Sequence, residues 1–316
     1  MRSRAFAALL LMLAVIMPGW AVIASASPAG EDAFLDRWDI TATGSPSGLP
    51  RNCWLELRRD DGVLKGRFNA GGGAVFDLPQ VTIERGELKF QYGKPEAPEV
   101  WQATVKAARL VGTAHLNGET LSWSGVRGPA WPATPPRRKP GKPIDLFNGK
   151  DVSGWLCQDP RRPMGWFVKD GILMNEGKGA NNIYTQQKFN DFKLEVEFNV
   201  DPQSNSGVYL RGRYEIQILD GYGRPLDVHS QGALYGFIVP AVNADKPAGE
   251  WQTHEITLIA NHVTVILNGT KIIDNGEVPG ITGGALDANE KGPGPILLQG
   301  DHGRVQFRKV RLTPLI

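Results

Sequence analysis

The sequence has 316 residues, enough for one large or two ordinary domains. Its 38 Gly and 23 Pro, with scarce helical periodicity and many short alternating runs, exclude a helical bundle and favour an all-β protein. The net charge of +2 falls to zero without Arg2 and Arg4, so no basic surplus indicates nucleic acid or anionic lipid as a partner. A neutral, sugar-like small molecule fits this composition better.

The first 26 residues have the pattern of a secretory signal peptide. Arg2 and Arg4 precede an apolar run at residues 5–16, and the sequence Ala24-Ser25-Ala26 is a typical cleavage site. The apolar run is too short for a membrane anchor. We therefore expect an exported protein, periplasmic or secreted, with no membrane span in the mature chain.

The pattern of short alternating runs in residues 32–131 predicts a small antiparallel β-barrel or meander domain. The alternation in residues 53–57 places Cys53, Leu55 and Leu57 on one face of a strand and Trp54 on the other. Gly-containing pairs between the runs are typical of hairpin turns. The pattern is weakly similar to lipocalin-like modules. No catalytic constellation is visible in this part.

A proline-rich segment, residues 132–143, predicts an extended linker. Residues 144–316 form a second candidate domain with numerous strands, which need two packed sheets or a closed barrel to bury one face each. Cys53 and Cys157 would lie in different domains, so two separate thiols are favoured over a disulfide.

Several ordered segments of the second domain carry a family resemblance. They are IDLFNGKDVSGW from Ile144, SNSGVYLRGRYEIQILD from Ser204, GALYGFIVPAVNADKPAGEWQTHEI, VTVILNGTKIIDN and GPILLQGDHGRVQFRKVRL. Together they resemble the 3-keto-disaccharide hydrolase family. The resemblance implies a concanavalin A-like jelly-roll sandwich that acts on glycosides with a ketone at carbon 3. Gly300 departs from the common family pattern, in which Gln is followed directly by Asp-His-Gly, and it puts the positions of Asp301 and His302 in doubt.

The run from Tyr214 to Asp220 predicts a strand with two different faces. Ile216 and Ile218 belong to the core, whereas Glu215 and Gln217 share the opposite, polar face. By the same alternation, the polar face also includes Arg213, and Arg211 unless Gly212 forms a bulge. An exposed strand with ion pairs is the alternative, but polar groups on a central strand can line a sugar cleft.

A ketone at carbon 3 acidifies the proton on carbon 2. One base can then remove this proton, and the substituent on carbon 1 leaves by β-elimination before water adds back. Glu215 and His302 are the candidate catalytic base and acid, in unresolved order. The candidates for substrate binding are Tyr209, Arg211, Arg213, Gln217, Tyr235, Trp251, Glu255, Gln299 and Asp301.

Two further points stay open at the level of the sequence. A divalent metal ion held by Glu215, Asp301 and His302 is an alternative way to stabilise the enolate, although no local metal motif supports it. The protein is alternatively a non-catalytic, lectin-like carbohydrate-binding protein of the cell envelope, or has a structural role, because fold does not fix function.

Overall fold

A computed structural model describes residues 30–45, 47–116 and 118–316, and the predicted signal peptide lies outside these ranges. Within them the chain is β throughout, apart from one short 3-10 helix, η1 (Glu31–Ala33). The predicted all-β class is therefore confirmed. No helix in the described ranges has the length and apolar character needed to cross a bilayer.

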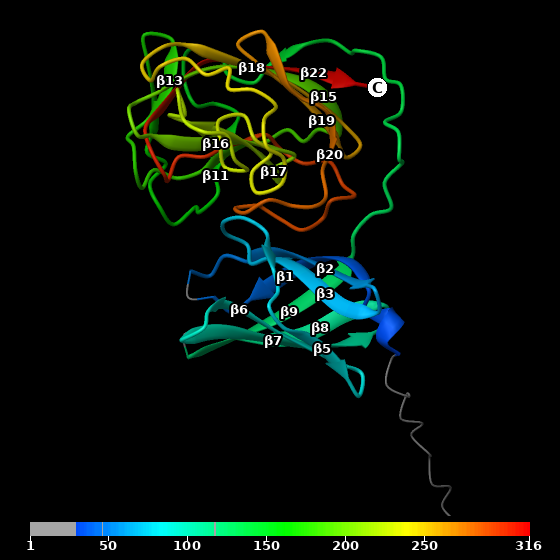
Figure 1. The fold of residues 1–316 in the computed structure, drawn as a ribbon. Helices are drawn as coiled ribbons and strands as arrows, with labels where there is room; N and C mark the ends of the chain where they lie inside the picture. Colours follow the sequence, from blue (N-terminus) through cyan, green and yellow to red (C-terminus); the bar gives the residue numbers. More distant parts are fainter. Residues whose placement is uncertain (1–29, 46, 117) are drawn as a thin grey trace, which may run out of the picture.

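The N-terminal part of the described chain forms one nine-stranded antiparallel sheet. Its strands are β1 (Asp36–Thr43), β2 (Arg51–Asp60), β3 (Val63–Asn69), β4 (Phe76–Asp77), β5 (Val81–Glu84), β6 (Glu87–Lys94), β7 (Ala97–Lys106), β8 (Arg109–Leu116) and β9 (Glu119–Arg127). Their order is β4-β3-β2-β1-β9-β8-β7-β6-β5, a meander in which β1 also pairs with β9. The sheet curls around its own apolar core (Figure 1).

The alternation along β2 assigns its side chains to two different cores. Cys53, Leu55 and Leu57 are buried inside the N-terminal sheet. Trp54 points to the other face and is completely buried within the core cluster of the C-terminal part. Its ring meets Phe237 edge-on, with centroids 5.7 Å apart. The two parts of the chain therefore share an apolar contact in addition to the linker.

The C-terminal part is a sandwich of two antiparallel sheets. The larger sheet consists of β10 (Ile144–Asp145), β12 (Trp166–Lys169), β13 (Ile172–Asn175), β15 (Asp191–Val200), β18 (Gln252–Ile259), β19 (His262–Leu267), β20 (Thr270–Glu277) and β22 (Val305–Leu315). The smaller sheet consists of β11 (Trp155–Cys157), β14 (Ile183–Thr185), β16 (Asn205–Leu210), β17 (Tyr214–Leu219) and β21 (Leu297–Leu298). The smaller sheet lies nearer the N-terminal sheet (Figure 1).

The sandwich core follows from period-two alternation on facing strands. On β15, Phe192, Leu194, Val196 and Phe198 are fully buried, while Lys193 is exposed. Such side chains from both sheets fill the space between them, as expected for a jelly-roll sandwich. The polar face of the smaller sheet is therefore turned outward, toward the N-terminal sheet.

The proline-rich segment at residues 132–143 contacts the last strand of the chain. Within the linker, the Lys139 backbone amide donates to the Ile316 carbonyl at 2.8 Å, and the Gly141 amide donates to the Pro314 carbonyl at 2.8 Å. The end of the linker thus pairs with the end of β22. Both cysteines are free thiols, Cys53 buried and Cys157 half-buried.

Candidate functional site

The hairpin of β16 and β17 supplies the central residues of the candidate site. Tyr209 lies directly opposite Glu215 in the register, and Gly207 lies opposite Gln217. Residues opposite each other in an antiparallel pair project on the same face. Ile216 and Ile218 are fully buried in the sandwich core, so the predicted division of this strand into an apolar and a polar face is confirmed.

Glu215 has a carboxyl group that is removed from solvent, with only 3% of the residue exposed. Its side chain lies over Gly207, where a Cβ would collide with the Glu215 Oε1 atom. Burial raises the pKa of Glu215 to about 8, while the Tyr209 hydroxyl and the charge of His302 oppose this rise. The charge of Asp301 acts in the same direction as burial. Glu215 therefore exchanges a proton near neutral pH, as a general acid or base requires.

Tyr209 is held in place by groups around the carboxyl. Its hydroxyl donates to the Gly283 carbonyl at 2.9 Å and lies 3.4 Å from the Gln299 Nε2 atom. Burial, followed by the neighbouring Glu215 charge, raises the pKa of Tyr209 well above its usual range. Tyr209 therefore stays protonated and acts as a hydrogen-bonding group beside Glu215.

The segment after β21 brings Asp301 and His302 to the same place. His302 Nδ1 lies 2.6 Å from Asp301 Oδ1. This hydrogen bond is the main reason that the pKa of His302 is raised. Because Asp301 engages Nδ1, Nε2 is the ring nitrogen available to a ligand. The pair resembles the carboxylate-oriented histidine used in general acid–base catalysis.

Gly300 accommodates the departure from the family pattern. A Cβ at this position would lie 2.7 Å from the Trp166 Nε1 atom and would collide with the Asn181 carbonyl. The Gly300 amide donates to Asn182 Oδ1 at 2.8 Å, and its carbonyl accepts from Asn175 Nδ2 at 2.9 Å. The inserted residue is thus fixed against the sandwich, and the two residues that follow still reach the site.

These groups surround a cavity of about 190 Å³. Its lining is mostly polar and comes from both parts of the chain: Gly71, Gly72, Gly73, Asn182, Asn205, Tyr209, Glu215, Gln217, Tyr235, Gly283, Gly284, Gln299, Asp301 and His302. Gln217 and Gln299 are both buried, and their Oε1 atoms have no hydrogen-bond partner among the described residues. Buried polar atoms are nearly always paired, so these amides are suited to a polar ligand.

Seven of the candidate residues therefore line one cavity: Tyr209, Glu215, Gln217, Tyr235, Gln299, Asp301 and His302. Sequence reasoning missed the glycines at 71–73 and 283–284, together with Asn182 and Asn205. The run of three glycines was visible in the sequence, but nothing local indicated that it faces the C-terminal part. Asn205 begins β16, so it could have been predicted from the same strand pair.

Arg211 and Arg213 do not line this cavity, and placing them on the polar face of a strand was wrong. The φ angles of Arg211 and Gly212 are 53° and 67°, and the Arg213 amide donates to the Leu210 carbonyl at 3.0 Å. These residues therefore form a tight hairpin turn. Arg211 is paired with Asp191 at 2.9 Å and Arg213 with Asp287 at 2.7 Å.

Trp251 and Glu255 likewise lie away from the cavity. They belong to the β18 region of the larger sheet, whose inner face buries His254 and Ile256. Their positions in the alternation point outward, where Glu255 is exposed. The Arg308 guanidinium lies 4.5 Å from the Trp251 ring centroid. Trp251 is thus covered by a cation rather than available for stacking on a sugar at this site.

The donor set for a metal ion is weak. Glu215, Asp301 and His302 line the same cavity, yet in the described ranges no group of three His, Cys, Asp or Glu side chains is arranged to hold a metal ion. Asp301 and His302 are already engaged with each other. These three side chains therefore do not fit the metal alternative.

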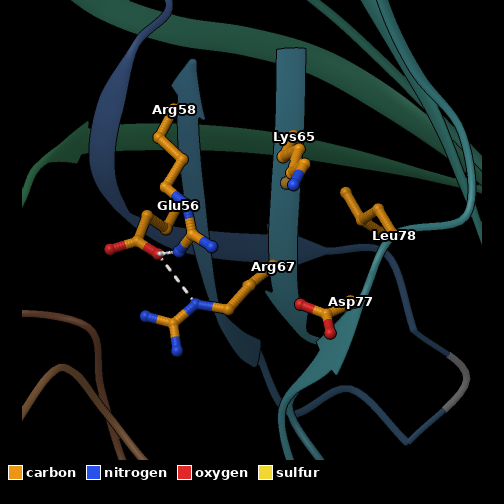
Figure 2. Close-up of a pocket in the computed structure, with 7 residues that line it drawn as sticks. Glu56, Arg58, Lys65, Arg67, Asp77 and Leu78 are labelled. Atoms are coloured by element: carbon orange, nitrogen blue, oxygen red, sulfur yellow. Dashed lines mark hydrogen bonds and ion pairs between the residues drawn. The ribbon is translucent and has the colours of Figure 1, made fainter. Parts of the chain in front are cut away.

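A second hollow, of about 270 Å³, lies on the N-terminal sheet (Figure 2). Its charged side chains are largely paired: Arg67 Nε lies 2.8 Å and Arg58 Nη1 3.3 Å from the same oxygen of Glu56. Leu78 and Asp77 complete the wall. With its charges satisfied by one another and partly exposed, this hollow has none of the buried unpartnered groups seen beside Glu215.

The C-terminal part of the chain matches a known protein family. The sequence model of the 3-keto-disaccharide hydrolase family, described as a 3-keto-alpha-glucoside-1,2-lyase-like domain, matches residues 142–313. The chain belongs to this family. The match contains β16, β17 and the Asp301–His302 pair but not the N-terminal sheet. Family membership supports a carbohydrate-active, hydrolase-like function.

Individual relatives cover part of the chain. A 3-keto-disaccharide hydrolase of Bacteroides thetaiotaomicron (strain VPI-5482) is 25% identical over 166 residues, which cover 42% of this chain and 57% of that protein. The chain thus spans a little over half of that relative's length. Two crystal structures of candidate glycosyl hydrolases from Parabacteroides distasonis ATCC 8503 are 29% and 22% identical, each with a TM-score of 0.45. They cover 58% and 55% of this chain, and 94% of each of those chains is covered.

Proposed function

We propose that this protein cleaves 3-keto-glycosides or 3-keto-disaccharides by proton abstraction at carbon 2, β-elimination and rehydration. The observation that carries the proposal is a buried carboxyl group of raised pKa, Glu215, lining one cavity together with an aspartate-oriented histidine, His302. The cavity is smaller than the range of about 300–1,000 Å³ typical of drug-sized ligands, so it suits one sugar ring, with the rest of the glycoside outside.

In the proposed mechanism, the Glu215 carboxylate removes the proton from carbon 2, and the electron pair forms an enolate with the carbon 3 ketone. The enolate collapses to the ketone while the bond between carbon 1 and the glycosidic oxygen breaks. His302, whose pKa is raised by its hydrogen bond to Asp301, acts in its protonated form and gives its proton to the departing oxygen. Water then adds at carbon 1 and a proton returns to carbon 2, which yields the free 3-keto sugar.

Stabilisation of the enolate requires donors on the cavity wall. The guanidinium groups of Arg211 and Arg213 are engaged elsewhere, so they do not fill this role. Gln217 and Tyr235 line the cavity beside Glu215 and supply an amide and a hydroxyl donor. Their fixed positions on the hairpin and its neighbouring loop cost little reorganisation during the reaction.

Direct hydrolysis by two carboxylates is the competing mechanism. Asp301 lines the cavity with Glu215, but its Oδ1 is hydrogen-bonded to His302. A carboxylate engaged in this way is better suited to orient the histidine than to attack carbon 1 or activate a water molecule. Only the elimination route depends on the ketone, and this difference provides the test.

The test compares methyl 3-keto-α-glucoside with methyl α-glucoside in deuterated water. We expect release of methanol only from the keto-sugar, and a product that carries deuterium at carbon 2. Cleavage of the unoxidised glucoside, or a product without label at carbon 2, would refute the elimination. Binding of both sugars without any turnover would support the lectin-like alternative, which the unpartnered amides of Gln217 and Gln299 also fit.

We further propose that the protein acts after export, in the periplasm or outside the cell. The proposal rests on the signal-peptide pattern of residues 1–26. N-terminal sequencing of the protein purified from its source checks it, with Ser27 as the expected first residue.

A further inference from the structure

The cavity beside Glu215 is not built by the family domain alone. Gly71, Gly72 and Gly73 lie in the loop between β3 and β4 of the N-terminal sheet, and all three line this cavity. The family match begins only at residue 142. A segment outside the family domain therefore forms part of the wall around the candidate catalytic groups.

This loop is held in place by backbone contacts. The Gly284 amide donates to the Gly71 carbonyl at 3.1 Å, and the Gly71 amide donates to Asn69 Oδ1 at 2.9 Å. A Cβ on Gly283 would lie 2.6 Å from the Gly73 carbonyl oxygen. The two glycine segments thus approach more closely than side chains would permit.

The N-terminal sheet also holds the segment that orients Tyr209. Asn52 Nδ2 donates to the Ala285 carbonyl at 2.9 Å, and Asn69 Nδ2 lies 3.4 Å from the Ile281 carbonyl. Between these two anchors, the Gly283 carbonyl accepts the Tyr209 hydroxyl at 2.9 Å. Side chains of β2 and β3 therefore hold both ends of the short segment whose Gly283 carbonyl orients the residue beside Glu215.

Apolar packing fixes the same interface. Trp54 is fully buried, and a Cβ on Gly280 would collide with its indole ring. On the C-terminal side, a Cβ on Gly236 would lie 3.0 Å from the Ala74 Cα atom, immediately after the glycine loop. The loop is therefore supported on both sides, as a binding surface requires.

Gly72 differs from its neighbours. A Cβ at Gly72 would meet no atom within 4 Å, and its φ angle lies outside the left-handed region. Neither packing nor backbone conformation therefore requires glycine at this position. Gly72 lines the cavity and has open space at its Cβ position, and the bare peptide groups of the loop can approach sugar hydroxyls.

We infer that the N-terminal sheet is part of the substrate site, and that its loop at residues 71–73 forms the wall against which the keto-hexose ring binds. The identity of the sugar rests on the proposed function. In this arrangement Gly72 sets the space left for the ring and its substituents, so it determines specificity without taking part in the chemistry.

The first test introduces bulk at Gly72 in the full chain. Gly72→Phe should lower kcat/KM for methyl 3-keto-α-glucoside at least tenfold, mainly through KM, without a change in the unfolding midpoint. Gly30→Phe is the matched control, because Gly30 is exposed, has an ordinary φ angle of −60° and has no atom within 4 Å of its Cβ position. It should stay within twofold of the wild type. Wild-type kinetics of Gly72→Phe would overturn the inference.

The second test requires neither catalytic turnover nor a Gly72→Phe variant that folds normally. Gly72→Cys in a Cys157→Ser background is alkylated with a maleimide in the presence and absence of methyl α-glucoside. The sugar should slow alkylation of this thiol at least threefold but leave the Gly30→Cys thiol unaffected. If the wild type cleaves no keto-glucoside, the proposed function fails while protection still supports the inference. Equal alkylation with and without sugar overturns it.

Discussion

The buried carboxyl of Glu215 should make the protein less stable than a variant that lacks the charge. The pKa of this group is raised from 4.5 to about 8, mainly by burial. A folded-state pKa above the unfolded value stabilises the protein fully below pH 4.5, and this contribution is lost as the pH rises through 8. The Glu215→Gln side chain has nearly the same shape but never ionises, so this variant does not lose stability as the pH rises.

The magnitude follows from the shift in pKa. One pKa unit is equivalent to about 1.4 kcal/mol. The rise in the pKa of Glu215 therefore lowers the free energy of unfolding by about 5 kcal/mol above pH 8 and by about 3 kcal/mol at pH 7, relative to a side chain that does not ionise. Glu215→Gln should therefore match the wild type near pH 4.5 and become more stable by about 3 kcal/mol at pH 7. Over the same range its turnover should fall by at least about a hundredfold, since the base is removed.

The assay is urea unfolding of both proteins at several values between pH 4.5 and 8.5. Glu255→Gln is the matched control, because Glu255 is exposed on the outer face of the sandwich and its replacement should change stability by less than about 0.5 kcal/mol. A stability difference between Glu215→Gln and the wild type that does not grow with pH would refute the proposed burial of an ionisable group. Full turnover by Glu215→Gln would show that Glu215 is not the base.

Two further predictions concern the same cavity. The value of kcat/KM for a 3-keto-glucoside should rise with pH toward about 8 if Glu215 must lose its proton to act as the base, and fall again where His302 loses its proton, whereas a fall through about 8 with no preceding rise would contradict the role of Glu215 as the base. Gly207→Ala should destabilise the protein by about 1–3 kcal/mol and displace the Glu215 carboxyl, because the new Cβ would collide with Oε1. Unchanged turnover and an unchanged unfolding midpoint would contradict the close contact between these residues.

The fold and half of the site could be predicted from local pattern. Alternation along residues 214–218 separates Ile216 and Ile218 from Glu215 and Gln217, because strand geometry alone decides which side chains share a face. The same alternation correctly predicted that the side chains of Trp54 and Leu55 lie on opposite faces of their strand. Asp301 and His302 became candidate site residues only through the family resemblance, because strand alternation gives no reason to choose them.

Other residues were misplaced because local pattern does not fix where a strand ends. Arg211 and Gly212 both adopt positive φ angles, so the chain turns just where alternation was expected to continue. An apolar run on each side of Arg-Gly was the available signal for a two-residue hairpin. Trp251 and Glu255 alternate as expected, but their strand belongs to the other sheet, and only the packing of the sandwich decides that.

The glycine loop at residues 71–73 could not be predicted as part of the site. It is more than 200 residues away along the chain from Gly283 and Gly284, its partners in space. Such contacts depend on how two complete sheets pack against each other. The periodicity of a sequence gives no information on that packing. The buried amide oxygens of Gln217 and Gln299 also become meaningful only after their surroundings are known.

The place of β22 in the larger sheet has a consequence for the order of folding. This strand lies between β13 and β15, and it pairs with residues more than 100 positions earlier in the chain. The N-terminal meander, in contrast, joins mostly consecutive strands and can form early from short loops. The larger sheet stays divided into β12–β13 and β15–β18–β19–β20 until β22 inserts, so the sandwich whose smaller sheet carries the candidate site is expected to be completed late. A chain halted before Val305 would contain Glu215, Asp301 and His302, yet it would lack an interior strand of the sheet that packs behind the smaller one.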